Sequence, residues 1–283
     1  MEKQSYQDKT ELKLMYYIEF LEIITNEYKN INIGKYKPLI EKEKIELKQK
    51  NDENSLLQIW FCLIIIVAID LYHKAFAEMK DRKYYNGWIE LGNIEVIIQE
   101  IKYNIPDCSN YITFIFLEKH TKYFQNIFPY KLFMSIVLVD TKEECSICGR
   151  SMNPYSECEH IRGKVYAGEI CYAIVSDGQW IGLDMAEKPA NKCAVLFKDL
   201  YNPEAYKLLE YLIPKLPNEY TNWNYKILTK YEPHSKYNII RNIKCPCESG
   251  KEYKNCCLNN PKGVPYEHYE FLLPDELLEK HKN

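Results

Sequence analysis

Glycine is scarce in this sequence, with 10 residues in 283, and the glycine-rich motifs of several enzyme classes are missing. There is no G-x4-G-K-S/T loop to hold phosphates, no G-x-S-x-G turn to expose a nucleophile and no G-x-G-x2-G dinucleotide fingerprint. ATPase, serine hydrolase and dinucleotide chemistry therefore have no support in the sequence.

A large charge of one sign is also absent. The 37 lysines and arginines and the 40 aspartates and glutamates give a net charge of −3. Binding nucleic acid over a whole surface requires a basic excess that this chain lacks. Arginine occurs at only four positions, and none precedes a histidine at the short spacing of the helical HEPN ribonucleases.

The chain has no apolar run of membrane-spanning length. The longest such run, Ile59 to Ile69, has 11 residues, whereas a bilayer core needs roughly 20. The N-terminal segment alternates charged and apolar residues and has no uninterrupted apolar region of the signal-peptide type. We therefore expect no membrane span and a cytoplasmic location.

Cysteine, in contrast, is abundant, with 11 residues. In a reducing compartment, clustered thiols are more often metal ligands than disulfides. Cys62, Cys108 and Cys193 lie singly in apolar segments, where cysteine acts as a small hydrophobe. The other eight form two clusters, one central and one near the C-terminus.

The pattern of apolar residues predicts a fold that is mainly α. Residues 1–130 are predicted to form a helical domain, an N-terminal bundle of four or five helices. One helix is expected to begin at a cap within Asp52 to Ser55 and to extend toward Arg82. The other helices are expected at Leu12–Ile24, Pro38–Lys50, Trp88–Tyr103 and Asn110–Phe124.

The pattern of apolar residues changes after residue 130. The β-rich segment Phe133 to Val139 and the glycine-broken apolar runs from Val165 to Leu196 predict a small central α+β zinc-stabilised unit across 131–200. Helices are expected to resume at Pro203–Leu212 and Asn218–Tyr231, within a helical segment at 201–240. A C-terminal zinc knuckle and tail are expected at 241–283.

The C-terminal cluster has the spacing C-x-C-x8-C-C. Its four thiols, Cys245, Cys247, Cys256 and Cys257, are enough for a closed tetrahedral zinc site. Around them, CPCESGKEYKNCC resembles the SEC-C motif, the zinc tail of the SecA translocation motor and of many otherwise unrelated bacterial proteins. The resemblance covers about residues 244–258 and implies a zinc-dependent interaction module. Glu248 stands where the motif usually has glycine.

The central cluster begins with the knuckle Cys145-x2-Cys148 and continues with Cys158-x-His160. These four residues form a Cys3His set, which we favour because the pairs are compact. Cys171 is a fifth candidate, and tetrahedral zinc uses only four ligands. Two zinc ions are therefore expected in the chain, with the last ligands of the central site chosen among Cys158, His160 and Cys171.

An enzymatic alternative rests on the central cluster. Glu159-His160-Ile161 resembles the Asp-His-Ile opening of HNH nucleases, whose histidine is the general base. The second knuckle and the later asparagine and histidine of that pattern are missing. The alternative is a metal-dependent nuclease or hydrolase, in which Cys171 replaces His160 as a ligand. Replacing His160 with alanine should unfold an adaptor but leave a nuclease folded and inactive.

Our interpretation from the sequence is a zinc-binding cytosolic adaptor or interaction protein with two structural zinc sites, and no reaction is predicted. The C-terminal knuckle is expected to bind a protein partner, and RNA or the ribosome is a further candidate. In a third interpretation, both knuckles only stabilise the fold and the function resides in the helical domain. The residues expected to contact RNA or the ribosome are Lys244, Lys251, Tyr253 and Lys254.

Overall fold

The computed structural model describes residues 37–153, 155–187, 189, 192–196, 203–237 and 240–274. The chain divides into two compact units, residues 1–220 and 221–283. The helix expected at Leu12–Ile24 lies outside the described residues.

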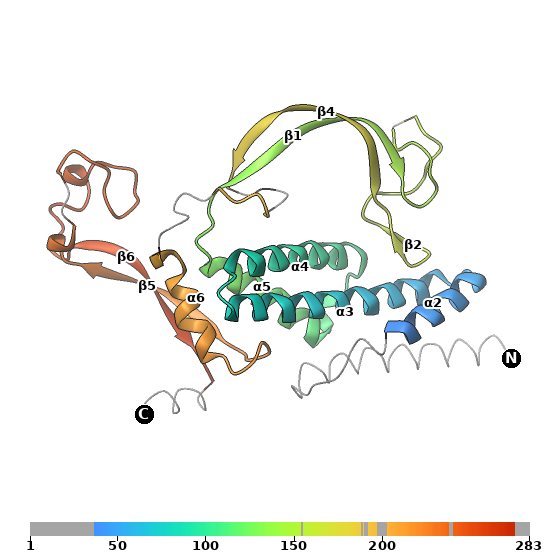
Figure 1. Cartoon of the computed structure of the whole chain (residues 1–283), viewed down its shortest axis with the longest axis horizontal. Coiled ribbons are helices and arrows are strands. Elements are labelled where there is room, and N and C mark those ends of the chain that lie inside the picture. The colour runs from blue at the N-terminus through green and yellow to red at the C-terminus, as the bar shows by residue number, and fades with distance from the viewer. Residues whose placement is uncertain are drawn as a thin grey trace. The chain divides into compact units, whose positions relative to one another are not determined.

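The first unit is built on a layer of helices (Figure 1). The helix expected to begin near Asp52 is confirmed, because the Asp52 carboxylate accepts a hydrogen bond from the Ser55 backbone amide at 3.2 Å and caps the helix. The other expected helices in this region are confirmed with small shifts at their ends. The helices are α2 (Lys37–Lys50), α3 (Glu53–Lys80), α4 (Tyr84–Asn104) and α5 (Ile112–Ile127).

Helix α3 supplies much of the core of this unit. Its apolar side chains are buried on several sides, as for Ile59, Ile69 and Tyr72, and it packs against α2, α4 and α5. By length and composition alone α3 is also a candidate membrane span, but 61% of its most apolar window is buried inside the protein. That burial is what a core helix shows, since its neighbours cover its apolar surface.

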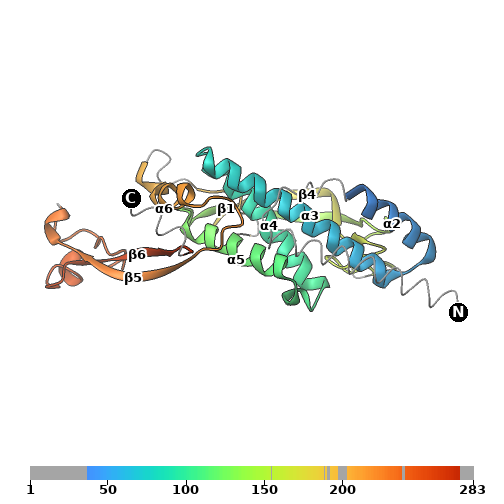
Figure 2. The same cartoon turned by 90° about the horizontal axis from the view of Figure 1, so that it is seen from below.

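A long two-stranded antiparallel sheet, the arm, follows the helices. It consists of β1 (Phe133–Cys145) and β4 (Ala173–Ala186), which arch over α4 in Figure 1 and are seen from below in Figure 2. The segment 146–172 connects the two strands and contains the short hairpin of β2 (Val165–Tyr166) and β3 (Glu169–Ile170). We call it the zinc lobe, after the zinc site that the sequence predicts there.

The expected α+β character of residues 131–200 is wrong in its α part. The described residues of this range contain strands and loops and no helix. The β-branched and aromatic residues of the arm favour strands, and the zinc lobe is broken by turns such as Ala167-Gly168, where both residues have positive φ. Turns of this kind join the strands of tight hairpins.

The arm is fixed to the helical layer at both ends. At the zinc lobe, the Asn104 side chain donates to the Gly163 carbonyl at 2.8 Å and accepts from the Val165 amide at 3.0 Å. At the opposite end, the indole of Trp88 stacks on Phe133 with ring centroids 6.0 Å apart. Since both ends are held, the arm is a bridge over α4 and not a free hairpin.

Helix α6 (Lys207–Leu212) and the 3-10 turn Pro203–Tyr206 before it confirm the helix expected at Pro203–Leu212. The helix expected at Asn218–Tyr231 is wrong, because β5 (Asn224–Glu232) pairs along its whole length with β6 (Val264–Leu272). These two strands form the second unit, and the C-terminal cysteine cluster lies in the segment that connects them. Pairing across this separation is not visible in a local reading of the sequence.

Candidate metal centres

The four C-terminal cysteines lie together in the second unit. Their sulfur atoms are all within 4.8 Å of one another. The Sγ atom of Cys256 lies 3.4 Å from Cys247 Sγ and 3.7 Å from Cys257 Sγ. A tetrahedral zinc site with Zn–S bonds of about 2.3 Å places its sulfurs about 3.8 Å apart. The donor set and its spacing therefore fit one zinc ion held by four thiolates.

Hydrogen bonds prepare this cluster for a cation. The Ser249 hydroxyl and backbone amide lower the pKa of Cys247 to about 6, against an opposing effect of burial. Burial raises the pKa of Cys245 and of Cys257. The lowered pKa of Cys247 favours its thiolate, and a cation would have to displace the protons of Cys245 and Cys257.

The knuckle is supported by a small core of its own. Tyr253 is only 3% exposed and packs with Val264 and two of the ligand cysteines. Its hydroxyl hydrogen-bonds to His234 Nδ1 at 2.5 Å, while His234 Nε2 lies 2.8 Å from the Asn260 carbonyl oxygen. Burial of Tyr253 corrects the expectation that its ring faces a partner, because a ring inside this core cannot stack on a base.

The central cluster brings together all five of its candidate ligands. The side-chain donor atoms of Cys145, Cys148, Cys158 and His160 all lie within 4.8 Å of one another. Two sulfur pairs are 3.6 Å apart, Cys148 with Cys158 and Cys145 with Cys171. His160 Nδ1 is 3.8 Å from Cys158 Sγ. These spacings fit tetrahedral zinc, with one more donor present than zinc uses.

Cys171 and His160 compete for the fourth position and have different surroundings. Cys171 is 0% exposed, and burial together with Cys145 raises the pKa of its thiol to about 11. His160 is half-buried and meets the Tyr166 ring edge-to-face at 4.6 Å. A buried thiol beside a ligand set is costly to ionise unless a metal ion is bound to it.

The backbone of the central knuckle is arranged for a thiolate. The Ile147 amide lies 3.4 Å from Cys145 Sγ, and Gly149 has a φ of +70° directly after the second cysteine. Burial raises the pKa of Cys145, but hydrogen bonds from the amides of Cys148 and Ile147 and from the thiols of Cys171 and Cys158 together offset this and bring it to about 6. The turn thus directs amide dipoles at Cys145 Sγ, an arrangement that favours the thiolate form of this cysteine.

The enzymatic alternative needs His160 to be available as a base. The structure places His160 among the candidate ligands of the central cluster, where binding to a metal would occupy its Nδ1. The nuclease alternative stays a prediction that this geometry does not favour.

His73 on α3 belongs to a separate cluster of polar side chains. Its Nδ1 pairs with Glu219, and its Nε2 lies 2.7 Å from the Tyr220 hydroxyl. The hydrogen bond from His73 lowers the pKa of Glu219, and burial raises the pKa of Tyr220 to above its usual range. This cluster ties residues 219–220 to α3, and sequence spacing alone does not reveal it.

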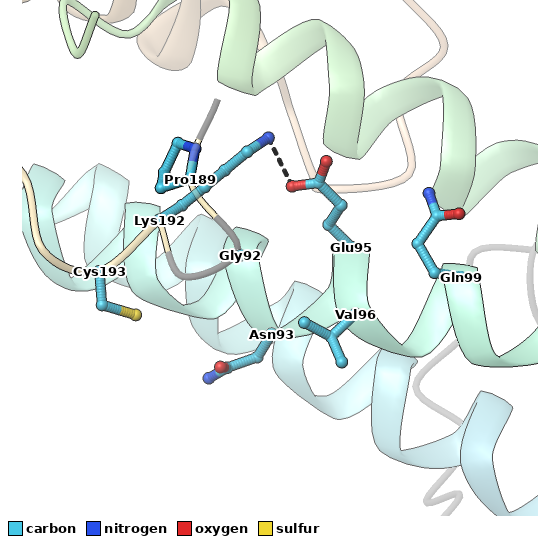
Figure 3. Close-up of a pocket in the computed structure, with 8 residues that line it drawn as sticks. All are labelled: Gly92, Asn93, Glu95, Val96, Gln99, Pro189, Lys192 and Cys193. Carbon is cyan, nitrogen blue, oxygen red and sulfur yellow. Dashed lines mark ion pairs between the residues drawn. The ribbon is translucent and has the colours of Figure 1, made fainter. Parts of the chain in front are cut away.

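A pocket of about 390 Å³ lies on α4 beside the base of the arm (Figure 3). Lys192 crosses it and pairs with Glu95 at 2.6 Å. Because this lysine is already neutralised, the pocket offers little charge to a ligand. Its lining residues are Gly92, Asn93, Glu95, Val96, Gln99, Pro189, Lys192 and Cys193.

Comparison with known proteins identifies one segment of the chain. A family model for the SEC-C motif matches residues 241–259, which include all four C-terminal cysteines. The segment is therefore an SEC-C motif, as its resemblance indicates. Neither a search of curated proteins nor a search of solved structures found a match to the chain.

Proposed function

We propose that this chain is a zinc-dependent adaptor whose two metal centres are structural and whose SEC-C motif contacts a protein or ribonucleoprotein partner. The observation that carries the proposal is the four-cysteine cluster within that motif, with exposed basic residues around it. The central centre, held by Cys145, Cys148, Cys158 and His160, stabilises the end of the arm.

The donor chemistry supports structural roles for both centres. Four thiolates complete a tetrahedral zinc site and leave no position for water or substrate. The central centre has a fifth donor, Cys171, within 3.6 Å of Cys145 Sγ. A reserve thiol next to the site works against an open position, because it can take the fourth position in place of His160. Lewis-acid chemistry on a bound substrate therefore has little room at either centre.

The surface of the SEC-C motif favours an acidic partner. Residues 241–262 contain five basic and two acidic side chains. Lys244, Lys251 and Lys254 are exposed, and Lys254 is partly neutralised by Glu252 at 3.0 Å. The contact is then electrostatic and weakens as salt rises. With Tyr253 buried, these lysines and not base stacking would carry the affinity for RNA.

The test uses the zinc-loaded full chain, immobilised and exposed to a lysate of its source cells with and without ribonuclease. Variants for comparison are Lys251→Glu with Lys254→Glu, and Cys245→Ser. The control is Lys226→Glu with Lys230→Glu, which changes exposed lysines of β5 in the same unit.

A partner that the parent and the control retain, and that both other variants lose, supports the proposal. Co-sedimentation with ribosomes at low salt, followed by release at high salt, would identify a ribonucleoprotein. An identical set of bound proteins in all four samples would contradict the adaptor role.

A further inference from the structure

The arm carries an exposed apolar surface that the two zinc centres do not explain. Directly opposed residues of an antiparallel pair lie on the same face of the sheet. Three such pairs alternate along β1 and are entirely apolar. They are Met134 with Met185, Ile136 with Leu183, and Leu138 with Trp180. We call these six residues the apolar arm face.

All six side chains are accessible. Their exposed fractions run from 40% for Met134 to 73% for Met185, with Trp180 at 62%. The alternate pairs on the opposite face are mixed, since Ser135 with Asp184 and Val139 with Gln179 carry polar side chains and Val137 with Gly182 does not. At these three pairs one side of the arm is therefore entirely apolar, and that side is exposed to solvent.

Such an arrangement is unfavourable for an isolated chain. A two-stranded sheet is marginally stable by itself, and here the exposed pairs are the large residues that normally face a core. The apolar arm face exposes on the order of 700 Å² of side-chain surface, more than the few hundred Å² usual for scattered apolar residues on a monomer. A surface of this kind marks a docking site.

We propose that a second copy of this chain covers the apolar arm face, so that two arms pack face to face in a symmetric dimer. The exposed area is close to the roughly 800 Å² per partner of a standard stable interface. A two-fold interface brings a surface against itself. The apolar arm face contains no charged residue, so self-contact has no like-charge repulsion and leaves no buried charge unpaired.

The way the arm is held also suits this geometry. The Phe133 end is stacked on Trp88, and the other end is fixed by Asn104 at the zinc lobe. A surface that is held at both ends loses little conformational freedom on docking. Two twisted sheets that pack face to face bury their apolar side chains between them, as in a β-sandwich.

The direct test is sedimentation of the zinc-loaded full chain over a range of concentrations. The parent should be a dimer. Ile136→Lys with Leu183→Glu places an opposite-charge pair across the two strands, which keeps the arm paired but charges its apolar face. This variant should dimerise at least about 100-fold more weakly, because each chain would bury two charges at the interface. The matched control, Val139→Glu with Gln179→Lys, changes the opposite face and should leave the dimer intact.

A second readout needs no disruptive substitution. Trp180 is exposed, whereas the other three tryptophans, Trp60, Trp88 and Trp223, are buried. Acrylamide quenching of tryptophan fluorescence should increase as the parent is diluted through dissociation, and Trp180→Phe should abolish that change.

The proposal has clear contrary outcomes. A parent that stays monomeric at high concentration overturns it, as does a dimer that the Ile136 and Leu183 variant leaves unchanged while the variant keeps its zinc. A monomeric parent that floats with phosphatidylcholine vesicles would assign the face to a lipid surface instead. Dimerisation is independent of partner binding by the SEC-C motif, so either result stands without the other.

Discussion

Replacing Glu248 with glycine should tighten zinc binding by the C-terminal centre. Glu248 follows the second cysteine of its knuckle and has a φ of +59°. The corresponding residue of the central knuckle, Gly149, has a φ of +70°. Both turns need the left-handed conformation after the second cysteine, and only the central one has the residue that adopts it without strain. This requirement accounts for the glycine usual at this position of the SEC-C motif.

The size of the effect follows from two opposing contributions. An ordinary L-residue in the left-handed region costs about 1–2 kcal/mol. Glycine removes that cost but gives the unfolded chain more freedom, which returns about 0.5–1 kcal/mol. The net gain is about 0.5 kcal/mol, and because zinc binding and folding of a small knuckle are coupled, zinc affinity should rise by about a factor of two.

Competition against a calibrated chelator measures this change in the full chain. Glu248→Gln, which removes the charge but keeps the side chain, should show no such gain. Glu252→Gly is the matched glycine control, because Glu252 has an ordinary φ of −63°, and it should weaken binding. If Glu248→Gly binds zinc no more tightly than Glu248→Gln, backbone strain at this turn does not limit the affinity.

Three further predictions concern the two units. The sequence alone predicts that His160→Ala unfolds an adaptor, but Cys171 lies 3.6 Å from Cys145 Sγ and can take the vacant position, so the variant should keep zinc at the central site. His160→Ala with Cys171→Ser should lose that zinc. X-ray absorption should show four sulfur ligands in the single variant, and loss of metal there would contradict the reserve role. Gly263→Ala should destabilise the second unit by about 2 kcal/mol or more, since its φ is +101° and the new Cβ would lie 2.1 Å from a backbone carbonyl oxygen; an unchanged melting temperature would refute this. Glu219→Gln should lower stability at neutral pH, and its difference from the parent in urea unfolding should shrink as the pH falls below the ordinary value of 4.5. The pKa of Glu219 is lowered in the folded state by His73, so the stabilisation is present above 4.5 and is lost in acid; a difference that is constant with pH would exclude this origin.

Local sequence signals predicted the helices and the ligand clusters well. The cap at Asp52 and the apolar run after it define α3 because capping and helical periodicity depend only on neighbouring residues. The cysteine spacings predicted which donor atoms lie close together for the same reason, since each knuckle is a short turn. The SEC-C match at 241–259 then agrees with the C-terminal thiols.

Contacts between distant segments could not be read in this way. The local sequence predicts a helix at 218–231, whereas residues 224–232 form a strand because they pair with residues 264–272. Tyr253 was expected at the surface, whereas the knuckle folds around it. The sequence also does not predict that the apolar arm face is exposed, because alternating apolar residues in a strand normally indicate a buried side. In each case the deciding contact joins residues that are distant in the sequence, and local propensity and periodicity cannot predict such a contact.

The most direct test of the account is metal content by inductively coupled plasma mass spectrometry, on the full chain purified without added metal. The parent, Cys145→Ser and Cys245→Ser are compared. The predicted result is two zinc ions per chain in the parent. Cys245→Ser should retain only the central zinc ion, and Cys145→Ser should lose that central ion or bind it more weakly while keeping the C-terminal one. One zinc or none in the parent would contradict two structural centres and would leave the unmetallated cluster open to redox chemistry.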